Sequence, residues 1–250
     1  MARLFVAPDL LGGDRVSLQG EQHRYLAKVL RLQAGDAVTV FDGAGNQIAA
    51  SIESSDQRTT VLRLGARRAT APAGQPVLLL QAIPKGDRMD LLVQKTTELG
   101  VARICPVVTE RTVVQPRGGG ADRGDNRLRR WRLIAQEAAR QCGRADVPAI
   151  DDPRSLDQAL ASTPADCARF FAWEDARQEA TALPLRRALS GSETAVALLV
   201  GAEGGFTASE AQLARQAGFT AVSLGPRILR SETCAIVAVA LVQAALGALD

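Results

Sequence analysis

The most constraining feature of the sequence is the stretch from Ala195 to Thr233, in which two short apolar runs each end in a glycine-containing loop. The run at 195–200 has the length and the Leu and Val content of a strand buried on both faces. A second run covers 221–224, and a helix is predicted between the two. Because parallel strands place the loops that follow them at one edge of a sheet, this pattern predicts an open α/β domain that binds a ligand there.

The predicted helix carries signals at both of its ends. Thr207 and Glu210 have the spacing of a capping box, in which each side chain binds a backbone N–H of the first turn. Gly218 is a natural residue directly after a helix C-terminus. The boundaries of this helix are therefore predicted at both ends.

The glycines of the two loops admit two interpretations. Gly201, Gly204 and Gly205 follow the first run and Gly225 follows the second, and glycine lets the backbone approach a ligand closely. Tight turns use the same residue, so the glycines alone leave a ligand site and a plain turn evenly balanced. The first loop has neither the Lys-Ser/Thr pair of a P-loop nor a GxGxxG fingerprint. The chemistry therefore indicates a nucleotide-like ligand without specifying it.

The two loops together resemble the paired cofactor loops of the SPOUT methyltransferases. VGAEGGF at 200–206 is followed by SLGPRILRSETC at 223–234, and the order and spacing of the two motifs are specific. In particular, the sequence resembles the RsmE-type enzymes, which methylate N3 of a uridine in 16S ribosomal RNA. Further similarity lies upstream, at 21–45, 83–101 and 131–148.

This resemblance implies a fold, an activity and a cofactor. The implied fold is a PUA-like β-barrel domain at 1–70, a linker at 71–76, and a SPOUT-type α/β methyltransferase domain at 77–250 whose C-terminal part forms a trefoil knot. The implied activity is transfer of a methyl group from S-adenosyl-L-methionine to the uridine. The residues expected to bind the cofactor are Leu199, Val200, Gly201, Glu203, Gly204, Gly205, Leu224, Gly225, Ile228, Leu229 and Thr233.

The implied reaction requires the proton on N3 of the uracil to leave. Glu203, Glu232 or Glu137 would accept it, or an arginine would stabilise the deprotonated base, and the sequence leaves these alternatives open. Arg144 and Arg230 are expected to give electrostatic support and to contact target phosphates. The expected catalytic set is therefore Arg230, Glu232, Glu203 and Arg144.

The first part of the chain reads as β-rich. Strands are expected at 3–7, 36–41, 47–52 and 60–64, with one helix at 21–29. Small β-barrels of this kind commonly bind nucleic acids, and HRYLAKVLRLQAGDAVTVFDGAG at 23–45 resembles the PUA-like domain of the same family. The basic residues expected to contact RNA phosphates are His23, Arg24, Lys28 and Arg31, although a single histidine near a helix start is more often structural.

A βαβ unit follows the linker. A strand at 77–83, a helix at 89–99 and a strand at 101–108 imply a parallel pair with a right-handed crossover. Lys85 and Arg88, between the first strand and the helix, are expected to contact the substrate. Lys95 and Glu98 lie three residues apart on the helix, where a surface ion pair and a functional role are equally compatible with the spacing.

Basic and polar residues concentrate at 117–144. The segment 117–132 holds six arginines against two aspartates, which is typical of a segment that grips phosphates, although a solvated loop has the same composition. A helix is expected at 129–142. Glu137 and Gln141 share one of its faces and Arg144 follows its end, so the three are expected to form a polar site that binds the substrate. EAARQCGRADVP at 137–148 also resembles the family.

Composition limits the compartment and the partners. The 250 residues carry a net charge of +3, one histidine and four scattered cysteines, so we expect a cytoplasmic protein with no disulfide and no metal site. No secretory signal is evident, and no membrane partner is expected. The uncharged stretch 233–249 indicates a final helix, expected at 234–246, that is buried on all sides. A homodimer would cover it, with Ala238, Val239 and Val242 expected at the contact.

Two other functions remain open at this point. A non-catalytic RNA-binding protein of ribosome assembly would use the same barrel and arginine-rich segment, but it has no need of two glycine loops. A dehydrogenase would need a fingerprint loop and an acidic ribose partner, and neither is found. Both the methyltransferase and the non-catalytic RNA-binding protein would have 16S ribosomal RNA or the small ribosomal subunit as their partner.

Overall fold

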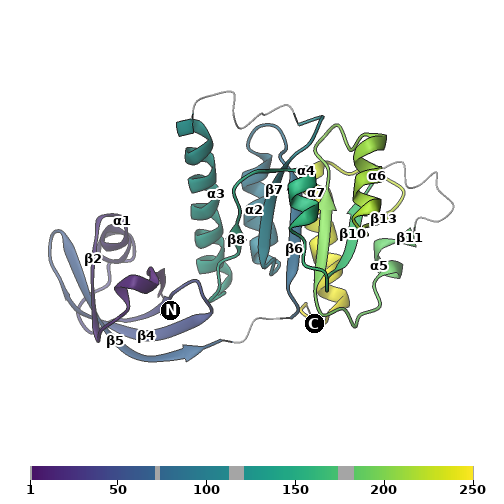
Figure 1. Ribbon diagram of the computed structural model, residues 1–250. Coiled ribbons are helices and arrows are strands. Elements are labelled where there is room, and N and C mark those ends of the chain that lie inside the picture. The colour runs from purple at the N-terminus through teal and green to yellow at the C-terminus, as the bar shows by residue number, and fades with distance from the viewer. Residues whose placement is uncertain (1, 71–73, 113–120, 174–182, 250) are drawn as a thin grey trace. The chain divides into compact units, whose positions relative to one another are not determined.

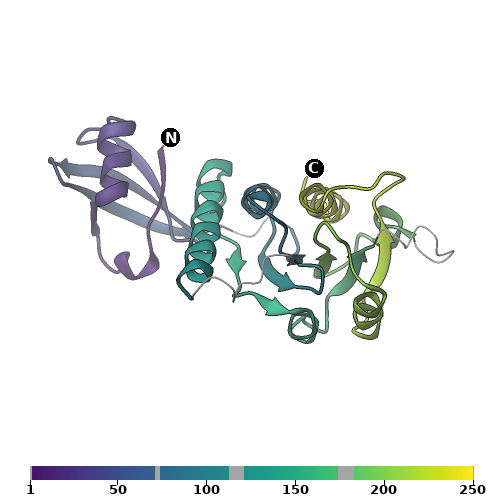
Figure 2. The same ribbon diagram turned by 90° about the horizontal axis from the view of Figure 1, so that it is seen from above.

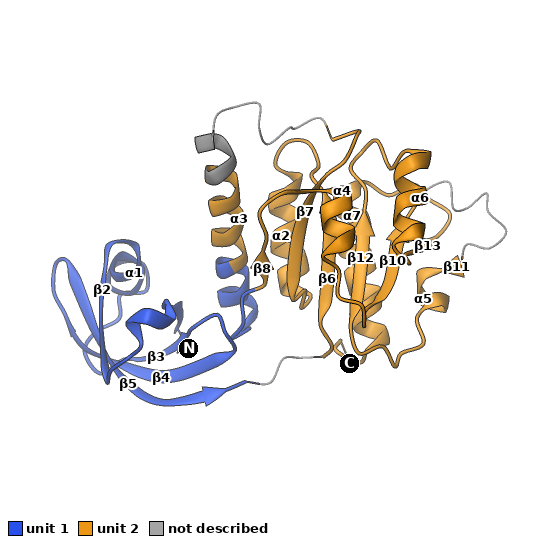
Figure 3. Ribbon diagram, in the orientation of Figure 1, with its two compact units in different colours: residues 1–72, 136–147 blue, residues 73–135, 148–250 orange. Residues whose placement is uncertain are grey.

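The computed structural model describes residues 2–70, 74–112, 121–173 and 183–249, without the side chains of 121–125 (Figure 1). Two compact units divide the chain (Figure 3). Unit 1 contains Met1–Pro72 and Gln136–Val147, and unit 2 contains Ala73–Ala135 and Pro148–Asp250. Unit 1 thus includes a segment that is distant in sequence. The first half of the expected linker, 71–73, lies outside the described residues.

Unit 1 is built on a five-stranded sheet with the order β1-β3-β4-β5-β2. Its strands are β1 (Ala2–Phe5), β2 (Arg15–Gln19), β3 (Ala37–Phe41), β4 (Asn46–Ser55) and β5 (Thr59–Ala69). β1 pairs in parallel with β3, and the other pairs are antiparallel. Within the described residues β1 and β2 are the two edges, so the expected barrel is seen as an open sheet.

Side chains from one face of this sheet form the core of unit 1. In β2 the exposed and buried residues alternate, and Val16 and Leu18 point into the core. The short helix α1 (Gly20–Arg24) continues into a π-helical turn, η2 (Tyr25–Val29), whose Leu26 is fully buried in the same cluster. The expected helix at 21–29 is therefore present as two consecutive helical types. β2 was not predicted.

The end of the segment 136–147, which belongs to unit 1, binds the turn between β3 and β4 through its backbone. The amide of Gly45 donates to the carbonyl of Ala145 over 3.2 Å, and the amide of Val147 donates to the carbonyl of Gly43 over 2.9 Å. Gly43 has φ of 77°, and a Cβ there would lie 2.9 Å from the Phe5 ring. Close packing of this turn therefore requires glycine at position 43.

Unit 2 contains a parallel sheet with the order β11-β13-β10-β12-β6-β7-β8, and β9 pairs with β7. All of its pairs are parallel, which confirms the expected βαβ arrangement. Its strands are β6 (Val77–Ala82), β7 (Arg103–Val108), β8 (Ala149–Ile150), β9 (Arg154–Ser155), β10 (Ala168–Ala172), β11 (Leu183–Pro184), β12 (Val196–Val200) and β13 (Thr220–Ser223). β12 is buried at every residue, as its apolar run predicts.

Helices cover both faces of this sheet (Figure 2). In that view α2 and α7 lie on one face and α4 and α6 on the other. The helices are α2 (Arg88–Glu98), α3 (Ala121–Cys142), α4 (Leu156–Ala161), α5 (Leu185–Ala188), α6 (Ala208–Gln216) and α7 (Ser231–Ala245). α3 begins eight residues before the expected start at 129 and continues into unit 1.

Helix α7 begins three residues earlier than predicted and packs within its own unit. Ala238, Val239 and Val242 are at most 1% exposed. The expectation that these three side chains make a dimer contact is therefore wrong, because they already fill the core of one chain. The partly or fully exposed apolar residues of α7 are Cys234, Ile236, Val237, Ala240, Leu241, Ala244 and Ala245.

Candidate active site

The candidate active site is a cavity of about 260 Å³ at the carboxyl ends of β10, β12 and β13, within unit 2. Its walls come from the end of β10, the loop after β12, and the segment between β13 and α7. This is the edge of the sheet at which the sequence predicted a ligand site. The lining residues are Ala172, Trp173, Val200, Gly201, Ala202, Glu203, Gly205, Val222, Ser223, Leu224, Arg227, Ile228, Leu229, Arg230, Ser231 and Cys234.

The structure brings most of the expected cofactor residues to this cavity. Those that line it are Val200, Gly201, Glu203, Gly205, Leu224, Ile228 and Leu229. Leu199 is 1% exposed in the core of the sheet and does not line the cavity. The remaining expected residues, Gly204, Gly225 and Thr233, are adjacent to lining residues without being part of the wall.

Two glycines of the cavity loops have backbone conformations that other residues rarely adopt. Gly205 has φ of 65° and Gly225 has φ of 99°. Nothing lies within 4 Å of a Cβ placed on Gly225, so its requirement for glycine comes from the backbone alone. These loops therefore need glycine for their shape at the mouth of the cavity.

A buried hydrogen-bond network fixes the start of α7 at the cavity. Ser231 is the first residue of α7, and its hydroxyl donates to the carbonyl of Gly201 over 2.6 Å. Gln81, on β6, donates from its side-chain amide to the Ser231 hydroxyl over 2.9 Å. One serine hydroxyl thus joins two strands to the helix, and sequence analysis did not identify it.

Glu203 is held by Lys85, in the loop that precedes α2, and by Arg88, the first residue of α2. Its carboxylate accepts the backbone N–H of Lys85 over 3.0 Å and forms an ion pair with the guanidinium of Arg88. Burial raises the pKa of Glu203, but the backbone hydrogen bonds and Arg88 outweigh it and bring the pKa below its ordinary value. Glu203 is therefore a carboxylate whose basicity is reduced. Of the two residues expected at the substrate, Arg88 binds this carboxylate and Lys85 has an exposed side chain.

Glu232, in the first turn of α7, is in a different environment. Arg88 Nε lies 3.9 Å from its Oε1. Its Oε2 is buried and has no hydrogen-bond partner among the described residues. A buried carboxylate oxygen without a partner is unusual in a folded protein. Glu232 directly follows the lining residue Ser231 without being part of the cavity wall. Arg230, the residue before α7, lines the cavity and is exposed.

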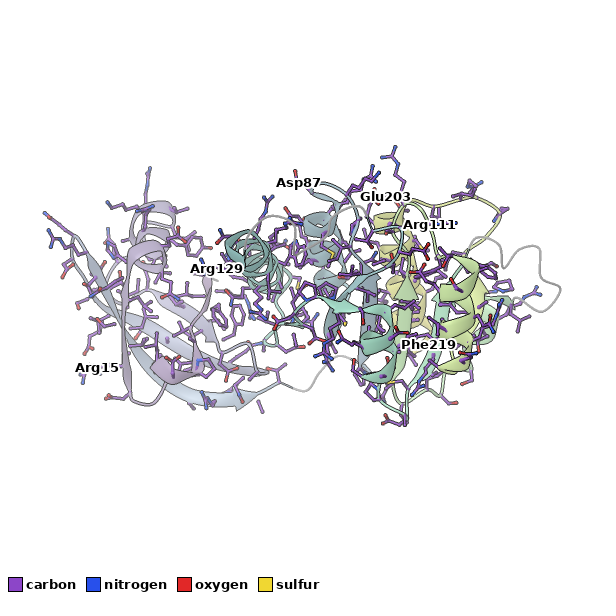
Figure 4. The ribbon with its side chains drawn as sticks, turned by 45° about the horizontal axis from the view of Figure 1, so that its top comes forward. Arg15, Asp87, Arg111, Arg129, Glu203 and Phe219 are labelled. Carbon is purple, nitrogen blue, oxygen red and sulfur yellow. The ribbon has the colours of Figure 1, made fainter. Side chains whose placement is uncertain are left out.

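The loop after β12 is also fixed from its outer side. Arg111 donates from its guanidinium to the carbonyl of Gly204 over 2.5 Å, and Arg111 and Glu203 lie side by side in Figure 4. A Cβ on Gly204 would lie 3.0 Å from the Cβ of Arg111. Next to this loop, the capping-box residue Glu210 accepts N–H groups from both Thr207 and Glu110. The capping box predicted from the sequence is confirmed.

Trp173 and Ser231 are cavity residues that the expected set did not contain. Trp173 follows β10, and the guanidinium of Arg215 on α6 lies 4.9 Å from its ring centroid. Its indole N–H is buried without a partner among the described residues. The sequence offered one signal for it, because the apolar run at 168–173 predicts a strand that ends at Trp173. Glu174, which follows it, lies outside the described residues.

Several expected substrate-binding residues belong to unit 1. Arg24, Lys28 and Arg31 are exposed. His23 is 4% exposed and its Nδ1 lies 2.9 Å from the Thr60 hydroxyl, so the expectation that it contacts RNA phosphates is corrected. Its position on the inner side of α1 explains the burial. Glu137, Gln141 and Arg144 also lie in unit 1.

The sequence predicted one polar site formed by Glu137, Gln141 and Arg144 at the end of α3, but the two charged residues of this trio do not bind each other. Glu137 binds Arg140 through an ion pair, and Arg144 binds Asp146 over 2.5 Å. Neither ion pair links Glu137 to Arg144. Each charged residue of the trio is therefore engaged with its own local partner.

The arginine-rich segment 117–132 falls partly outside the described residues. Arg117 and the side chain of Arg123 are among the parts that are not described. Arg129 is exposed on α3 (Figure 4). Arg130 forms an ion pair with Asp90 of α2, and Arg132 donates to the carbonyl of Ile150 over 3.0 Å. Lys95 and Glu98 form an ion pair over 2.9 Å. Arg130 and Arg132 are thus engaged within unit 2.

No group of three or more His, Cys, Asp or Glu side chains suited to a metal ion occurs in the described part of the chain. Among the helices described, none has the length and apolar character needed to cross a membrane.

Comparison with known families agrees with this architecture. A family model described as an RNA methyltransferase domain matches residues 71–243, and one described as an RNA methyltransferase PUA domain matches residues 18–65. The fold, the cavity at the strand ends and these matches define an RNA methyltransferase with an N-terminal PUA domain.

Individual relatives are more specific. The chain is 34% identical to the ribosomal RNA small subunit methyltransferase E of Synechocystis, over 98% of this chain and 78% of the relative. It is 30% identical to the Bacillus subtilis protein of the same name, over 89% and 87% of the two chains. The chain belongs to the ribosomal RNA small subunit methyltransferase E family.

Two solved structures are similar along almost the whole chain. The Neisseria gonorrhoeae member of the family, solved bound to S-adenosyl methionine, is 32% identical with a TM-score of 0.83, covering 98% of this chain and 97% of that one. A Legionella pneumophila methyltransferase, solved in complex with the bound cofactor, is 32% identical with a TM-score of 0.84, covering 97% of each chain.

Proposed function

We propose that this protein transfers a methyl group from S-adenosyl-L-methionine to N3 of a uridine in 16S ribosomal RNA. The observation that carries the proposal is the cavity at the ends of β10, β12 and β13, because the two specific sequence motifs meet there. Family membership supports the reaction, and the cofactor-bound relatives support the ligand. At about 260 Å³ the cavity is slightly smaller than the roughly 300 Å³ at which small-molecule sites begin.

The residues present fit this cofactor. Apolar side chains such as Ile228 and Leu229 would contact the adenine, and the backbone of 200–205 and 224–229 would bind the polar atoms. The buried indole N–H of Trp173, which lacks a partner among the described residues, is a further candidate donor. When bound, the cofactor supplies an already activated methyl group, so the protein's main task is to hold the uracil in line with it.

We assign removal of the N3 proton to Glu232. Glu203 is bound by Arg88 and the Lys85 amide and has a lowered pKa, which makes it a weaker base than an ordinary carboxylate. Glu232 has a carboxylate oxygen without a partner among the described residues, and its other oxygen lies 3.9 Å from Arg88. Arg88 thus orients both carboxylates, and exposed Arg230 would stabilise negative charge on the deprotonated base. Glu137 binds Arg140 in unit 1.

We also infer that the C-terminal part of unit 2 forms a trefoil knot, as the family resemblance implies. Its support in this chain is the arrangement in which Ser231 begins α7 against Gly201 and Gln81, at the ends of two different strands. The chain must pass these strand ends before α7 covers β6 and β12.

We propose a homodimer that covers α7. Ile236, Val237, Ala240, Leu241 and Ala244 leave apolar surface partly or fully exposed along this helix, and a two-fold contact would bury the same face of both copies. Light scattering at micromolar concentration tests this. A fully active monomer would exclude the dimer, and Ala240→Glu is expected to produce a monomer.

The remaining parts of the proposal concern the substrate and its location. We infer that the protein works in the cytoplasm on 16S ribosomal RNA or on the small subunit, and that Arg24, Lys28 and Arg31 contact phosphates. We retain 1–70 as the PUA-like domain and 77–250 as the methyltransferase domain, noting that residues 136–147 pack with the former.

Two measurements test the function. Calorimetry should detect binding of S-adenosyl-L-methionine and not of NAD or ATP. Mapping of methylated uridines in 16S RNA from cells lacking the protein should show one N3-methyluridine lost, and restored by the wild-type chain but not by Glu232→Gln. Unchanged methylation together with no cofactor binding would instead favour a non-catalytic RNA-binding protein.

A further inference from the structure

Unit 1 contains a second cavity, of about 440 Å³, which has no part in the active site described above. It lies between the start of β1, the π-helical turn η2 with the residues that follow it, and the end of α3. Its chemically distinctive members are Arg3, Tyr25, Leu30, Arg140 and Gln141. All of them belong to unit 1, so the cavity is complete within one compact unit.

The central feature of this cavity is a cation–π pair formed by Arg140 and Tyr25. The guanidinium carbon of Arg140 lies 4.7 Å from the centroid of the Tyr25 ring. Arg140 Nη1 donates to the Tyr25 hydroxyl, while Nε and Nη2 donate to the two carboxylate oxygens of Glu137. The hydrogen bond with Glu137 raises the pKa of Arg140, although burial opposes it. The guanidinium is therefore charged and fixed in one plane.

These bonds decide which kind of ligand the pair can bind. Nε, Nη1 and Nη2 of Arg140 each donate a hydrogen bond to Tyr25 or Glu137. The hydrogen-bonding edge of the guanidinium is therefore largely occupied. A phosphate binds the N–H edge of an arginine, whereas a nucleobase stacks on its plane or on an aromatic ring. The pair thus presents flat surfaces to a ligand, which favours a base over a phosphate.

The walls around the pair complete a site of mixed character. Leu30 is 36% exposed and Leu32 is partly exposed, and both line the cavity. Arg31 between them has φ of 56°, a left-handed conformation that is uncommon for a residue other than glycine. This conformation allows the two leucines to line the same cavity. Strained backbone of this kind often accompanies a binding site.

Charge and hydrogen-bonding capacity also match a nucleic acid. The lining residues include two arginines and no carboxylate. Arg3 is anchored by donating to the carbonyl of Arg144 over 2.9 Å, and its guanidinium carbon lies 5.3 Å from the Phe41 centroid. Gln141 is exposed at the cavity and carries both a donor and an acceptor, which is the pattern that reads the edge of a base.

We propose that this cavity binds one unpaired nucleobase of the RNA substrate, stacked on the Tyr25–Arg140 pair with Gln141 at its edge. The proposal rests on the proposed function only in taking RNA as the substrate. Sequence-specific recognition of RNA commonly uses bases that are splayed out of single-stranded segments. The site would hold such a base in unit 1 while another nucleotide reacts in unit 2.

The test compares oligonucleotides that carry bases with an oligomer of the same backbone that carries none. Oligouridylate and oligoadenylate of about ten nucleotides are titrated against an abasic ribose-phosphate oligomer of equal length, with the full chain. Wild type is expected to bind the base-bearing strands more tightly. Tyr25→Leu is expected to weaken their binding by about tenfold and to leave the abasic oligomer unaffected. Since no phosphate contact is lost, the dependence of affinity on salt should stay the same.

Two further variants separate stacking from structural effects. Tyr25→Phe keeps the ring and loses only the hydroxyl, so it should retain most of the affinity. Arg63→Ala removes an exposed charge of unit 1 that pairs with Glu53 outside the cavity, and it should leave the preference for bases unchanged. Circular dichroism and thermal melting check that each variant is folded.

The proposal is overturned if wild type binds the abasic oligomer as tightly as the base-bearing strands. It is also overturned if Tyr25→Phe and Tyr25→Leu lose affinity equally, because the hydroxyl contact with Arg140 would then be the important one. Methyl transfer to 16S RNA by the wild-type chain is measured separately. Its absence would contradict the proposed function and leave the oligonucleotide result intact.

Discussion

The hydroxyl of Ser231 donates a hydrogen bond to the carbonyl of Gly201 across 2.6 Å, joining the first residue of α7 to the loop after β12. Both residues line the candidate cofactor cavity. The same hydroxyl accepts a hydrogen bond from Gln81 on β6. The shape of the cavity therefore depends on one small polar side chain between three elements.

Ser231→Ala should weaken both the fold and cofactor binding. It leaves the Gly201 carbonyl and the Gln81 amide without this partner in a buried position, which costs about 1–3 kcal/mol of unfolding free energy. Denaturant unfolding and calorimetry with S-adenosyl-L-methionine measure the two effects. Ser209→Ala is the matched control, because that residue is exposed and its hydroxyl binds Thr207 among the residues that the structure describes. Equal behaviour of the two variants would contradict the role given to Ser231.

Gly225→Val should lower cofactor affinity while the protein stays folded. At φ of 99° a β-branched residue is strained, so the loop must adopt another conformation at the cavity. Gly35→Val is the control, since Gly35 has φ of 94° with equally open surroundings but lies in unit 1. Calorimetry decides the outcome. If both variants bind the cofactor like wild type, the loop conformation at Gly225 has no part in binding.

Glu232→Gln should reduce the rate of methyl transfer by about 100-fold or more, as expected for loss of a general base. Glu203→Gln is its counterpart beside the same arginine. We expect a smaller loss of rate because Arg88 and the Lys85 amide already bind the Glu203 carboxylate and its pKa is lowered. Single-turnover kinetics at saturating cofactor separates rate from binding. A larger loss in the Glu203 variant would reverse the assignment.

Unit 1 should lose stability in acid partly through Asp42. Its carboxylate is 3% exposed and accepts N–H groups from Ala44 and Asn46. Burial raises the pKa of Asp42, but these hydrogen bonds, with Arg67 nearby, bring it below the ordinary value. A carboxylate whose folded pKa is lowered stabilises the protein above the unfolded pKa, and this contribution is lost as pH falls below about 4.

The matching variant is Asp42→Asn. Chemical unfolding should find it less stable than wild type at pH 7 by about 1–3 kcal/mol, with the difference shrinking as the pH falls below about 4. A difference that is constant across this range would mean that the charge of Asp42 is not what stabilises the turn. The comparison needs conditions in which unit 1 melts separately or first.

Local signals in the sequence predicted most of unit 2. The buried run of β12 and the capping box of Thr207 and Glu210 depend on neighbouring residues alone, and both are found in place. β2 was not predicted because its alternation of Val16 and Leu18 with polar residues is short and lies between turn-rich segments. The start of α7 was placed too late because Ser231 and Glu232 are polar and read as loop.

Contacts between distant residues could not be predicted in the same way. Nothing local to Ser231 indicates that it binds Gly201, and nothing near His23 indicates that Thr60 buries it. The burial of Val239 in its own chain depends on how α7 packs against the sheet, which the uncharged composition of the helix does not reveal. Residues that bind through such contacts required the structure.

The inclusion of 136–147 in unit 1 has a consequence for how the chain folds during synthesis. The backbone hydrogen bonds of Gly43 and Gly45 cannot form until Ala145 and Val147 have left the ribosome, about a hundred residues later. At five to twenty residues per second, that interval is on the order of five to twenty seconds. During it, the β3–β4 turn is exposed without its partner. The N-terminal unit, although translated first, can reach its final form only after much of the second unit has emerged.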